Sequence, residues 1–334
     1  MSEQGKSAPL VSVVMPAYNG ERYIAQAIDS ALEQTYRPME IIVVDDGSTD
    51  STAQKVAAYG EQVRCIHQEN AGCPAARNAG IAAAGGEFIA LLDDDDVWLP
   101  EKTAMQMSLF DLDASLGLVF TQKLYIDQNC NALDGMDPQE LPPPVELVAL
   151  EPGPGAFRIE GDLFESLLAR CFLMPSMVIV RKSALQAVGG FDVSLPFVED
   201  YDMWLRLAAE GVRFGWLVRP LIHRRRHPQS GVQNHVKVAQ FRASLLEKLR
   251  RHPICRDQGR ASAVRLATAG AHKSLGDYLA VARRMPEARE GYGKAMRTRF
   301  RPIHALNWLA TWMGPLALPL MRTMNRQGDI FHQI

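Results

Sequence analysis

The chain has 334 residues, of which 47% are hydrophobic and 22% charged, and its formal net charge is −2. This composition is typical of a globular protein and excludes a disordered or fibrous chain. The near-neutral total conceals an asymmetry: residues 1–210 contain 13 basic and 32 acidic residues, whereas residues 211–334 contain 23 basic and 6 acidic ones. A difference of this size indicates that the two parts face different partners.

The cysteines and the N-terminus indicate in which cellular compartment the protein lies. The five cysteines are an odd number, and none of their spacings matches a disulfide framework or a Cys/His zinc site. A reducing compartment is therefore expected. The first nine residues lack the apolar stretch of a signal peptide. We expect a cytoplasmic protein and leave open a peripheral position on the inner face of the plasma membrane.

The first hundred residues alternate between two periodicities. Apolar runs typical of buried strands occupy 11–15, 41–44, 63–67 and 88–92, and helical spacing predicts helices over 24–32 and 74–84. This alternation predicts an α/β, Rossmann-like fold with a mainly parallel sheet flanked by helices. Ligands of such sheets bind at the carboxyl ends of the strands, where Asp45-Asp46 and Asp93–Asp96 fall.

The remaining elements are spaced less regularly. The proline-rich stretch 129–157 predicts a long loop that acts as a lid or an insertion. After it we expect an ordered segment at 163–168, strands at 177–180 and 214–218, and a helix over 199–209. From about residue 238 to 301 the pattern is helical and rich in arginine, which predicts a helical C-terminal extension.

Four adjacent carboxylates, Asp93 to Asp96, directly follow the predicted strand 88–92. They repel one another and need a compensating cation or full solvation. Oxygen ligands suit Mn²⁺ or Mg²⁺, which bridge one or two carboxylates to substrate phosphates. The alternative is a solvated acidic loop or an incidental Ca²⁺ site. The position at the end of a buried strand favours a functional cation site.

Three other charged motifs each have two explanations. Asp45-Asp46-Gly47-Ser48 can accept hydrogen bonds from a base or a ribose, although it is also ordinary turn chemistry. Glu199 and Asp200 begin a predicted helix, where a carboxylate can act as a general base or can simply be favoured by the helix dipole. The basic run His223–His227 can contact a diphosphate or form a solvated surface patch.

Six motifs occur in order along residues 10–235. They are Pro16-Ala17-Tyr18-Asn19, Asp45-Asp46-Gly47-Ser48-Thr49-Asp50, Ala76-Arg77-Asn78-x-Gly80, Asp93-x-Asp95-Asp96-x-Trp98-x-Pro100, Gly189-Gly190-Phe191-Asp192 followed by Glu199-Asp200-x-Asp202-x-Trp204, and Arg226-His227-x-x-Ser230. Together they resemble the motifs of the inverting glycosyltransferases of family 2, which have the GT-A fold. One departure is Arg224, which stands where an aromatic residue is common in that family.

The resemblance implies a domain organisation. The catalytic domain is expected over residues 1–235, with a nucleotide-binding half at about 10–125 and an acceptor half at about 160–235. The basic helical region 236–334 follows it.

The resemblance also implies roles in donor binding. Tyr18 is expected to pack against the nucleotide base, and Asp46, or less favourably Asp45, to bond its edge. Arg77 is expected near the base or the phosphates, and Asp93 near the ribose. The full set of implied nucleotide-sugar contacts is Pro16, Tyr18, Asp45, Asp46, Arg77, Asp93, Asp94, Arg226 and His227.

For the chemistry, the resemblance implies that Asp95 ligates a divalent cation, Mn²⁺ or Mg²⁺, that bridges the diphosphate. Asp200 is the expected catalytic base, with Glu199 supporting it, and His227 and Arg226 are expected to close over the diphosphate. The cation neutralises the leaving oxygen while the base takes the proton of the attacking hydroxyl. A single displacement inverts the anomeric centre, so no carboxylate nucleophile is needed.

The expected reaction transfers a sugar from a UDP-, GDP- or dTDP-sugar to a hydroxyl of a glycan or lipid-linked acceptor. The product is expected to be a polysaccharide, a lipopolysaccharide or another cell-surface glycan. One alternative is a catalytically silent nucleotide-sugar or glycan-binding scaffold, which the presence of Asp95 and Asp200 disfavours. Another is a nucleotidyltransferase, which typically has a Gly-rich, Lys-bearing loop where this chain has Tyr18-Asn19-Gly20. No nucleic-acid motif accompanies the basic part, so no nucleic-acid partner is expected.

Residues 302–321 contain no Asp, Glu, Lys or Arg, and three arginines closely precede them. A spanning helix needs about 20 mainly apolar residues, but prolines and a glycine interrupt this segment. We expect an interfacial anchor on an anionic membrane surface, with Trp308 and Trp312 at headgroup depth. The alternative is a buried helix pair packed on the catalytic domain or on another subunit.

Overall fold

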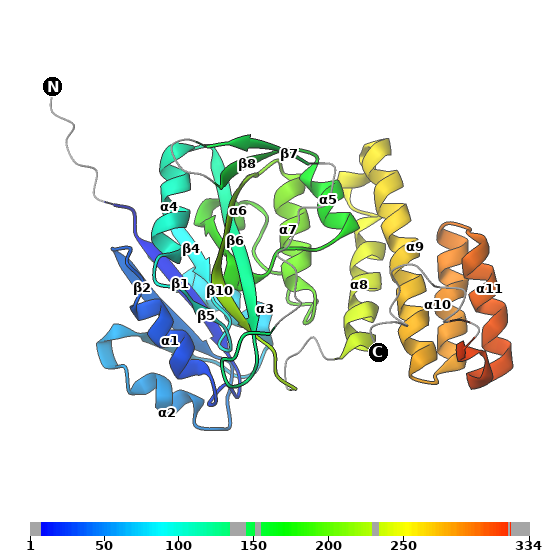
Figure 1. Cartoon of the computed structure of the whole chain (residues 1–334), viewed down its shortest axis with the longest axis horizontal. Helices are drawn as coiled ribbons and strands as arrows, with labels where there is room; N and C mark the ends of the chain where they lie inside the picture. Colours follow the sequence, from blue (N-terminus) through cyan, green and yellow to red (C-terminus); the bar gives the residue numbers. More distant parts are fainter. Residues whose placement is uncertain (1–7, 134–144, 151–154, 229–233, 320, 322–334) are drawn as a thin grey trace. The chain divides into compact units, whose positions relative to one another are not determined.

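The computed structural model describes residues 8–133, 145–150, 155–228, 234–319 and 321. The chain forms two compact units, residues 1–228 and 229–334 (Figure 1). The first is an α/β unit built on one sheet, and the described part of the second consists of helices.

One mixed sheet forms the centre of the first unit. Its strands are β1 (Val11–Ala17), β2 (Met39–Asp45), β3 (Arg64–His67), β4 (Phe88–Leu91), β5 (Val97–Trp98), β6 (Leu116–Ile126), β7 (Val145–Ala149), β8 (Ala156–Gly161), β9 (Val178–Arg181) and β10 (Arg213–Arg225). Their order across the sheet is β3-β2-β1-β4-β9-β6-β10-β8-β7, with β5 paired to β10. Strands β1 to β4 are mutually parallel, whereas β9 runs antiparallel to both of its neighbours.

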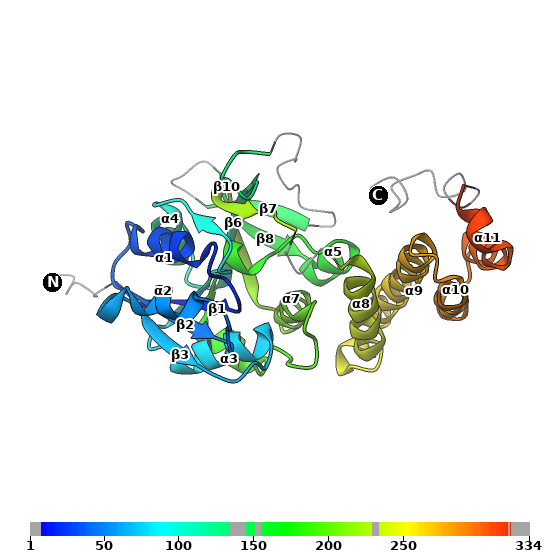
Figure 2. The same ribbon diagram turned by 90° about the horizontal axis from the view of Figure 1, so that it is seen from below.

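Helices cover both faces of this sheet. They are α1 (Ile24–Leu32), α2 (Thr52–Ala57), α3 (Cys73–Ala83), α4 (Lys102–Leu112), α5 (Leu163–Ala169), α6 (Lys182–Ala187) and α7 (Glu199–Ala209). Figure 2 shows α1 and α4 on one side and α3 and α7 on the other. The residues of β1 are buried throughout, as expected of a strand covered on both faces. Helix α3 approaches β1 closely at Gly80, where a Cβ would lie 2.5 Å from Val14 Cγ1.

The predicted α/β fold is confirmed. The strands and helices predicted in the first hundred residues begin and end within two residues of the expected bounds. The helix over 199–209 is also confirmed, and the segment at 163–168 forms α5. Residues 102–126, for which we had no prediction, contain α4 and β6.

The prediction of one long loop over 129–157 is wrong where the chain is described. Residues 145–149 form β7, which pairs with β8, and β8 pairs in turn with β10. The cause is cross-strand pairing, which creates strands where the local periodicity is weak. The prolines of this stretch lie in 134–144 and 151–154, outside the described residues. The strand predicted at 214–218 is also longer than expected, because β10 continues to Arg225.

The described helices of the second unit are α8 (His235–Leu249), α9 (Gln258–Val281), α10 (Met285–Thr298) and α11 (Pro302–Ala310), followed by the 3₁₀ helix η5 (Thr311–Ala317). Two caps fit the sequence: Asn234 accepts from Lys237 N at the start of α8, and Asp257 accepts from Arg260 N at the start of α9. Helices α9 and α10 meet at a glycine, since a Cβ on Gly276 would lie 2.8 Å from the Tyr292 ring.

The helical pattern predicted up to residue 301 is present as α8, α9 and α10. The uncharged segment after it is broken into α11 and η5, with a kink at Gly314 (φ 64°). Among the described residues, no helix is both long enough and apolar enough to cross a membrane.

Candidate active site

The loops after β1, β2 and β4 meet at the carboxyl edge of the sheet. Asn19, which follows β1, accepts a hydrogen bond from Thr49 N at 2.8 Å, and Asn19 N donates to Ser48 Oγ at 3.0 Å. Gly20 allows close approach to the loop with Asp93–Asp96, which we call the acidic loop, because a Cβ at Gly20 would lie 2.2 Å from Asp94 Oδ2. Three of the predicted motifs therefore come together at one edge, as expected for parallel strands.

The two nucleotide-sugar contacts predicted at the end of β1, Pro16 and Tyr18, differ in exposure. Pro16 is buried in the strand, in register with Val44 of β2. Tyr18 is 52% exposed, although a large aromatic side chain is usually covered. Its ring is accessible at the sheet edge and can stack on a ligand.

Asp45 and Asp46 are both buried and organise the neighbouring loops. The Asp46 carboxylate accepts hydrogen bonds from the Gln68 side chain at 2.7 Å and from the backbone N–H groups of residues 71 and 72 at 2.9 and 2.8 Å. Asp45 Oδ1 accepts from Ser48 N at 3.0 Å. Both carboxylates thus have structural partners within the turn, whatever they contribute to ligand binding.

Arg77 of α3 connects two other predicted site residues. Its guanidinium donates to Asp93 Oδ1 at 2.7 Å and also to Glu199 Oε1. The Arg77 side chain is only 4% exposed, and it lies over the Phe191 ring at 5.4 Å. A buried cation with two carboxylates fixes the acidic loop and the start of α7 relative to each other.

The neighbouring Asn78 explains why two of the motifs belong together. Its side-chain amide donates to Phe191 O and accepts from Phe191 N, both at 2.8 Å. Gly190 has φ 76°, and a Cβ there would lie 2.8 Å from Asn78 Oδ1. The Gly-Gly turn is required for this close approach.

Asp200, the predicted base, lies in the first turn of α7. Burial, followed by the adjacent Glu199 carboxylate, raises the pKa of Asp200 from its ordinary 3.8 to about 7. Its Oδ1 accepts a hydrogen bond from Tyr201 N at 2.7 Å. Glu199 is held by Arg77, so the two adjacent carboxylates have different environments. A carboxyl group with a pKa near neutrality is well matched to proton transfer.

The four carboxylates of the acidic loop point to different partners. Asp95 Oδ2 lies 3.0 Å from His227 Nε2, while Asp96 accepts from Ser176 Oγ at 2.6 Å and from Arg225 N at 3.1 Å. Burial, together with the neighbouring charge of Asp95, raises the pKa of Asp94 and of Asp96 well above the ordinary range. Among the described residues, two of these four carboxylates have side-chain ion-pair partners: Asp93 pairs with Arg77 and Asp95 with His227.

Side chains of the basic run 223–227 point in alternate directions, because the run begins within strand β10. Arg225 is buried and donates to Asp95 O at 3.0 Å and to Gln26 Oε1 at 2.6 Å. Arg226 is exposed, and its guanidinium lies 4.6 Å from the centre of the Tyr125 ring. The Arg224 guanidinium lies 5.9 Å from the centre of the same ring. The structure therefore brings His227, but not the Arg226 guanidinium, into contact with the acidic loop.

Arg225 and Ser176 are the site residues that the sequence did not reveal. Both support Asp96, and Ser176 Oγ also accepts from Asp93 N at 3.1 Å. If the predicted strand had been extended through residues 219–225, the alternation of side chains along a strand would have shown which of these residues point inward and which point outward. We find no sequence signal that could have identified Ser176.

Asp95 and His227 form the pair best suited to a divalent cation. Their oxygen and nitrogen atoms converge, and their side chains are 28% and 9% exposed, so the pair is accessible mainly through Asp95. Among the described residues, no group of three His, Cys, Asp or Glu side chains is arranged around a metal position. The donor set fits Mn²⁺ or Mg²⁺, which complete their coordination with water and phosphate oxygens.

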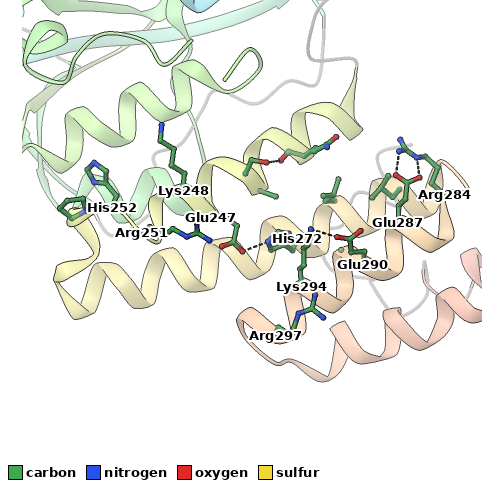
Figure 3. A pocket seen from close by; sticks show the side chains of 17 residues that line it. Glu247, Lys248, Arg251, His252, His272, Arg284, Glu287, Glu290, Lys294 and Arg297 are labelled. Carbon is green, nitrogen blue, oxygen red and sulfur yellow. Dashed lines mark hydrogen bonds and ion pairs between the residues drawn. The ribbon is translucent and has the colours of Figure 1, made fainter. Parts of the chain in front are cut away.

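A separate cavity lies within the second unit, between α8, α9 and α10 (Figure 3). Its volume is about 1130 Å³, and it contains none of the predicted site residues. Its three glutamates are each paired: Glu247 with His272, Glu287 with Arg284, and Glu290 with Lys294. No aromatic ring that could stack on a sugar lines it apart from the two histidines. The cavity therefore does not resemble a sugar-binding or catalytic site.

Comparisons with known proteins identify the family of the chain. Residues 12–130 match the family model "Glycosyl transferase family 2", and residues 161–253 match "Glycosyl transferase family group 2". An uncharacterized glycosyltransferase of Rickettsia typhi is 35% identical over 206 residues, which are 61% of this chain and 60% of that protein. The Escherichia coli enzyme named UDP-Glc:alpha-D-GlcNAc-diphosphoundecaprenol beta-1,3-glucosyltransferase WfgD is 31% identical over 59% of this chain and 69% of its own length.

Solved structures show the same fold. TarS of S. aureus, residues 1–349 in complex with UDP-GlcNAc, superposes with a TM-score of 0.68 at 17% identity, covering 96% of this chain and 92% of that one. The mannosyltransferase PcManGT of Pyrobaculum calidifontis, in complex with GDP-Man and Mn²⁺, gives a TM-score of 0.56 at 20% identity over 98% of this chain and 85% of its own.

The fold and its sheet-edge site define a GT-A protein. The chain belongs to glycosyltransferase family 2. It spans about 60% of the length of the first curated relatives that it matches.

Proposed function

We propose that this chain is an inverting glycosyltransferase that moves a sugar from a nucleotide donor to a hydroxyl of a cell-surface glycan acceptor. The observation that carries the proposal is the position of the half-buried Asp200 carboxyl in the first turn of α7, where its surroundings raise its pKa to about 7. It stands at the start of α7 beside Glu199, which Arg77 ties to the acidic loop after β4. Family membership makes glycosyl transfer the expected use of this geometry.

Asp200 is the base in this proposal. The acceptor oxygen attacks the anomeric carbon, its proton passes to an Asp200 carboxylate oxygen, and the bond from the anomeric carbon to the diphosphate oxygen breaks with its electron pair. The nucleoside diphosphate leaves from the opposite face, so the configuration inverts. Glu199 is less suited to the role because Arg77 already holds its carboxylate.

Asp95 Oδ2 and His227 Nε2 are the atoms that would hold Mn²⁺ or Mg²⁺. When bound, the cation supplies electrostatic stabilisation of the charge that develops on the leaving diphosphate. The residue roles around it are also proposals. Tyr18 offers its exposed ring to the base, and Arg77 and Asp93 form the wall between nucleotide and acceptor.

We further propose a UDP-sugar as donor and a lipid-linked glycan as acceptor. The name of WfgD specifies UDP-Glc and a diphosphoundecaprenol-linked acceptor, and TarS is described with UDP-GlcNAc. PcManGT is described with GDP-Man and Mn²⁺, so UDP and GDP are compared directly in the titration. A lipid-linked acceptor requires that the enzyme work at a membrane surface, which we take to be the cytoplasmic face.

Calorimetric titration of UDP, GDP and dTDP, each with and without Mn²⁺, tests the donor and the cation together. We expect UDP to bind best and Mn²⁺ to strengthen its binding. Asp95→Ala should remove the Mn²⁺-dependent part, about tenfold or more in Kd. Asp111→Ala, a change to an exposed acid on α4, serves as the matched control. Equal UDP binding by wild type with and without Mn²⁺ would refute the cation site.

A further inference from the structure

The segment α11 with η5 carries apolar side chains on its outer side as well as polar and apolar ones on its buried side. His304, Asn307 and Thr311 lie on the buried side, each no more than 3% exposed. The opposite side carries five exposed apolar side chains, which we call the outer apolar face. They are Leu306 (49% exposed), Leu309 (57%), Trp312 (63%), Met313 (56%) and Leu316 (83%).

The exposed apolar side chains on the outer side are not what contact with water alone would select. A surface helix of a globular protein normally buries its apolar stripe and exposes its polar residues. Single exposed apolar side chains are ordinary, but here five lie within residues 306–316, four of them before the kink at Gly314. Such a face indicates a surface that is covered when the protein works.

The segment is fixed in this orientation by contacts within the second unit. The Arg289 guanidinium of α10 donates to Thr311 Oγ1 at 3.1 Å and to Thr311 O at 3.2 Å. Ala310 belongs to a buried apolar cluster with Ala288 and Tyr292 of α10, and Trp308 packs against that cluster. Rolling α11 over to hide the outer apolar face would break these contacts.

The surroundings of the face are cationic. Arg297, Arg299 and Arg301 immediately precede α11 and are exposed. Phe300, between two of them, is 67% exposed. The Arg289 guanidinium lies 3.6 Å from the centre of the Trp312 ring, which places a positive charge on the apolar face itself. Arginine beside exposed Trp and Leu is the combination that binds the boundary between lipid headgroups and acyl chains.

We propose that the outer apolar face, with Arg297, Arg299 and Arg301, docks on an anionic lipid bilayer. The apolar side chains enter the headgroup region, and the arginines meet the negative headgroups. The inference extends the lipid-linked acceptor of the proposed function by naming the surface that reaches the membrane. Docking itself does not depend on that function, so the two can fail separately.

Flotation with vesicles of phosphatidylcholine alone, or of phosphatidylcholine mixed with phosphatidylglycerol, tests the proposal on the full chain. We expect the wild type to float with the mixed vesicles and about tenfold less with phosphatidylcholine alone. The variant Leu309→Ser/Trp312→Ser/Leu316→Ser should lose binding to both. The variant Arg299→Gln/Arg301→Gln should lose only the preference for the anionic vesicles.

Two controls separate docking from general surface effects. Leu266 of α9 is also an exposed apolar residue, 41% exposed, and Arg265 beside it is exposed. The variant Leu266→Ser/Arg265→Gln should float like the wild type. All variants should retain the wild-type circular dichroism and UDP affinity, which shows that they are folded whether or not they bind lipid.

Two results would overturn the proposal. One is equal flotation of the triple serine variant and the wild type. The other is a wild type that does not float but forms a dimer that the serine substitutions dissociate in sedimentation velocity, which would make a second copy the occupant of the face. Loss of sugar transfer with flotation intact would instead count against the proposed function alone.

Discussion

The two units of the chain differ in where they place their most notable charged and apolar side chains. In the first unit, charged groups are buried and held against one another, as with Arg77 between Glu199 and Asp93. In the described part of the second unit, the pairs Arg250–Glu247, Arg284–Glu287 and Lys294–Glu290 lie at the surface, although Asp277 is buried beside Lys273, and apolar side chains such as Leu309 and Leu316 are exposed.

This contrast gives the division of charge along the sequence a physical meaning. Buried carboxylates are costly to ionise, and their altered pKa values suit chemistry on a bound substrate. Exposed arginines around an apolar face suit binding to a charged surface. This difference agrees with the proposals that the acidic part carries the reaction and the basic part docks on a membrane. Each of the following experiments changes one side of the contrast.

The largest effect is expected at Asp200. Asp200→Asn keeps the size and the burial of the side chain but removes the proton acceptor, so kcat should fall by about 10²–10⁴-fold. UDP affinity should stay within about twofold of the wild type, because the residue acts on the acceptor hydroxyl. UDP release gives kcat, and calorimetry gives the affinity. A matching loss of nucleotide affinity would show that Asp200 binds the donor and is not the base.

The next-largest effect is expected on the stability of the variant Arg77→Ala. Arg77→Ala leaves the buried Glu199 carboxylate without its cation and should lower the free energy of unfolding by about 3–5 kcal/mol. Arg219→Ala removes an exposed arginine that lies 3.8 Å from Glu101, and it should change the stability by no more than about 0.5 kcal/mol. Urea unfolding of the two variants measures both values. Similar losses would mean that the buried ion pairs contribute no more than surface ones.

A third experiment uses pH. The pKa of Asp200 is about 7 in the folded chain and 3.8 without the fold. As a base it must be ionised, so kcat/KM should rise with pH up to about 7 and level off above. Between these two pKa values the unfolded chain has released a proton that the folded chain retains, so this group makes the wild type less stable as pH rises.

Asp200→Asn removes that penalty. Its Tm should therefore exceed the wild-type Tm by an amount that grows from about pH 4 to about pH 7 and is constant above. Thermal melts across this range measure the difference. A Tm difference that does not depend on pH would mean that the Asp200 carboxyl ionises in the folded state as it does in water.

Much of the fold was predictable because it depends on local patterns. Continuous apolar runs identified β1, β2 and β4, and helical spacing identified α1 and α3. Strands β7 and β8 were missed because β7 depends on pairing with β8, and β8 on pairing with β10, a partner distant in sequence. Exposed or half-covered strands lack the apolar continuity that marks a central one.

The motifs of the site could be predicted from the sequence, but which residue pairs with which depends on three-dimensional contacts. The sequence shows four equivalent carboxylates in a row, but the partners that distinguish Asp95 from Asp96 are His227 and Ser176, more than seventy residues away. Likewise, the outward direction of Leu309 cannot be read from residues 302–321. It follows from packing against α10.

The smallest effect is expected for the surface pairs of the second unit. The Lys294 ammonium lies 2.8 Å from Glu290, but both side chains are about half exposed or more, so water competes for each charge. Lys294→Ala should shift the Tm by no more than about 1 °C, and high salt should remove even that difference. Differential scanning calorimetry at low and high salt measures it. A salt-resistant loss of several degrees would show that charge stabilises the second unit from within, as in the first, and the contrast between the units would then rest on the outer apolar face alone.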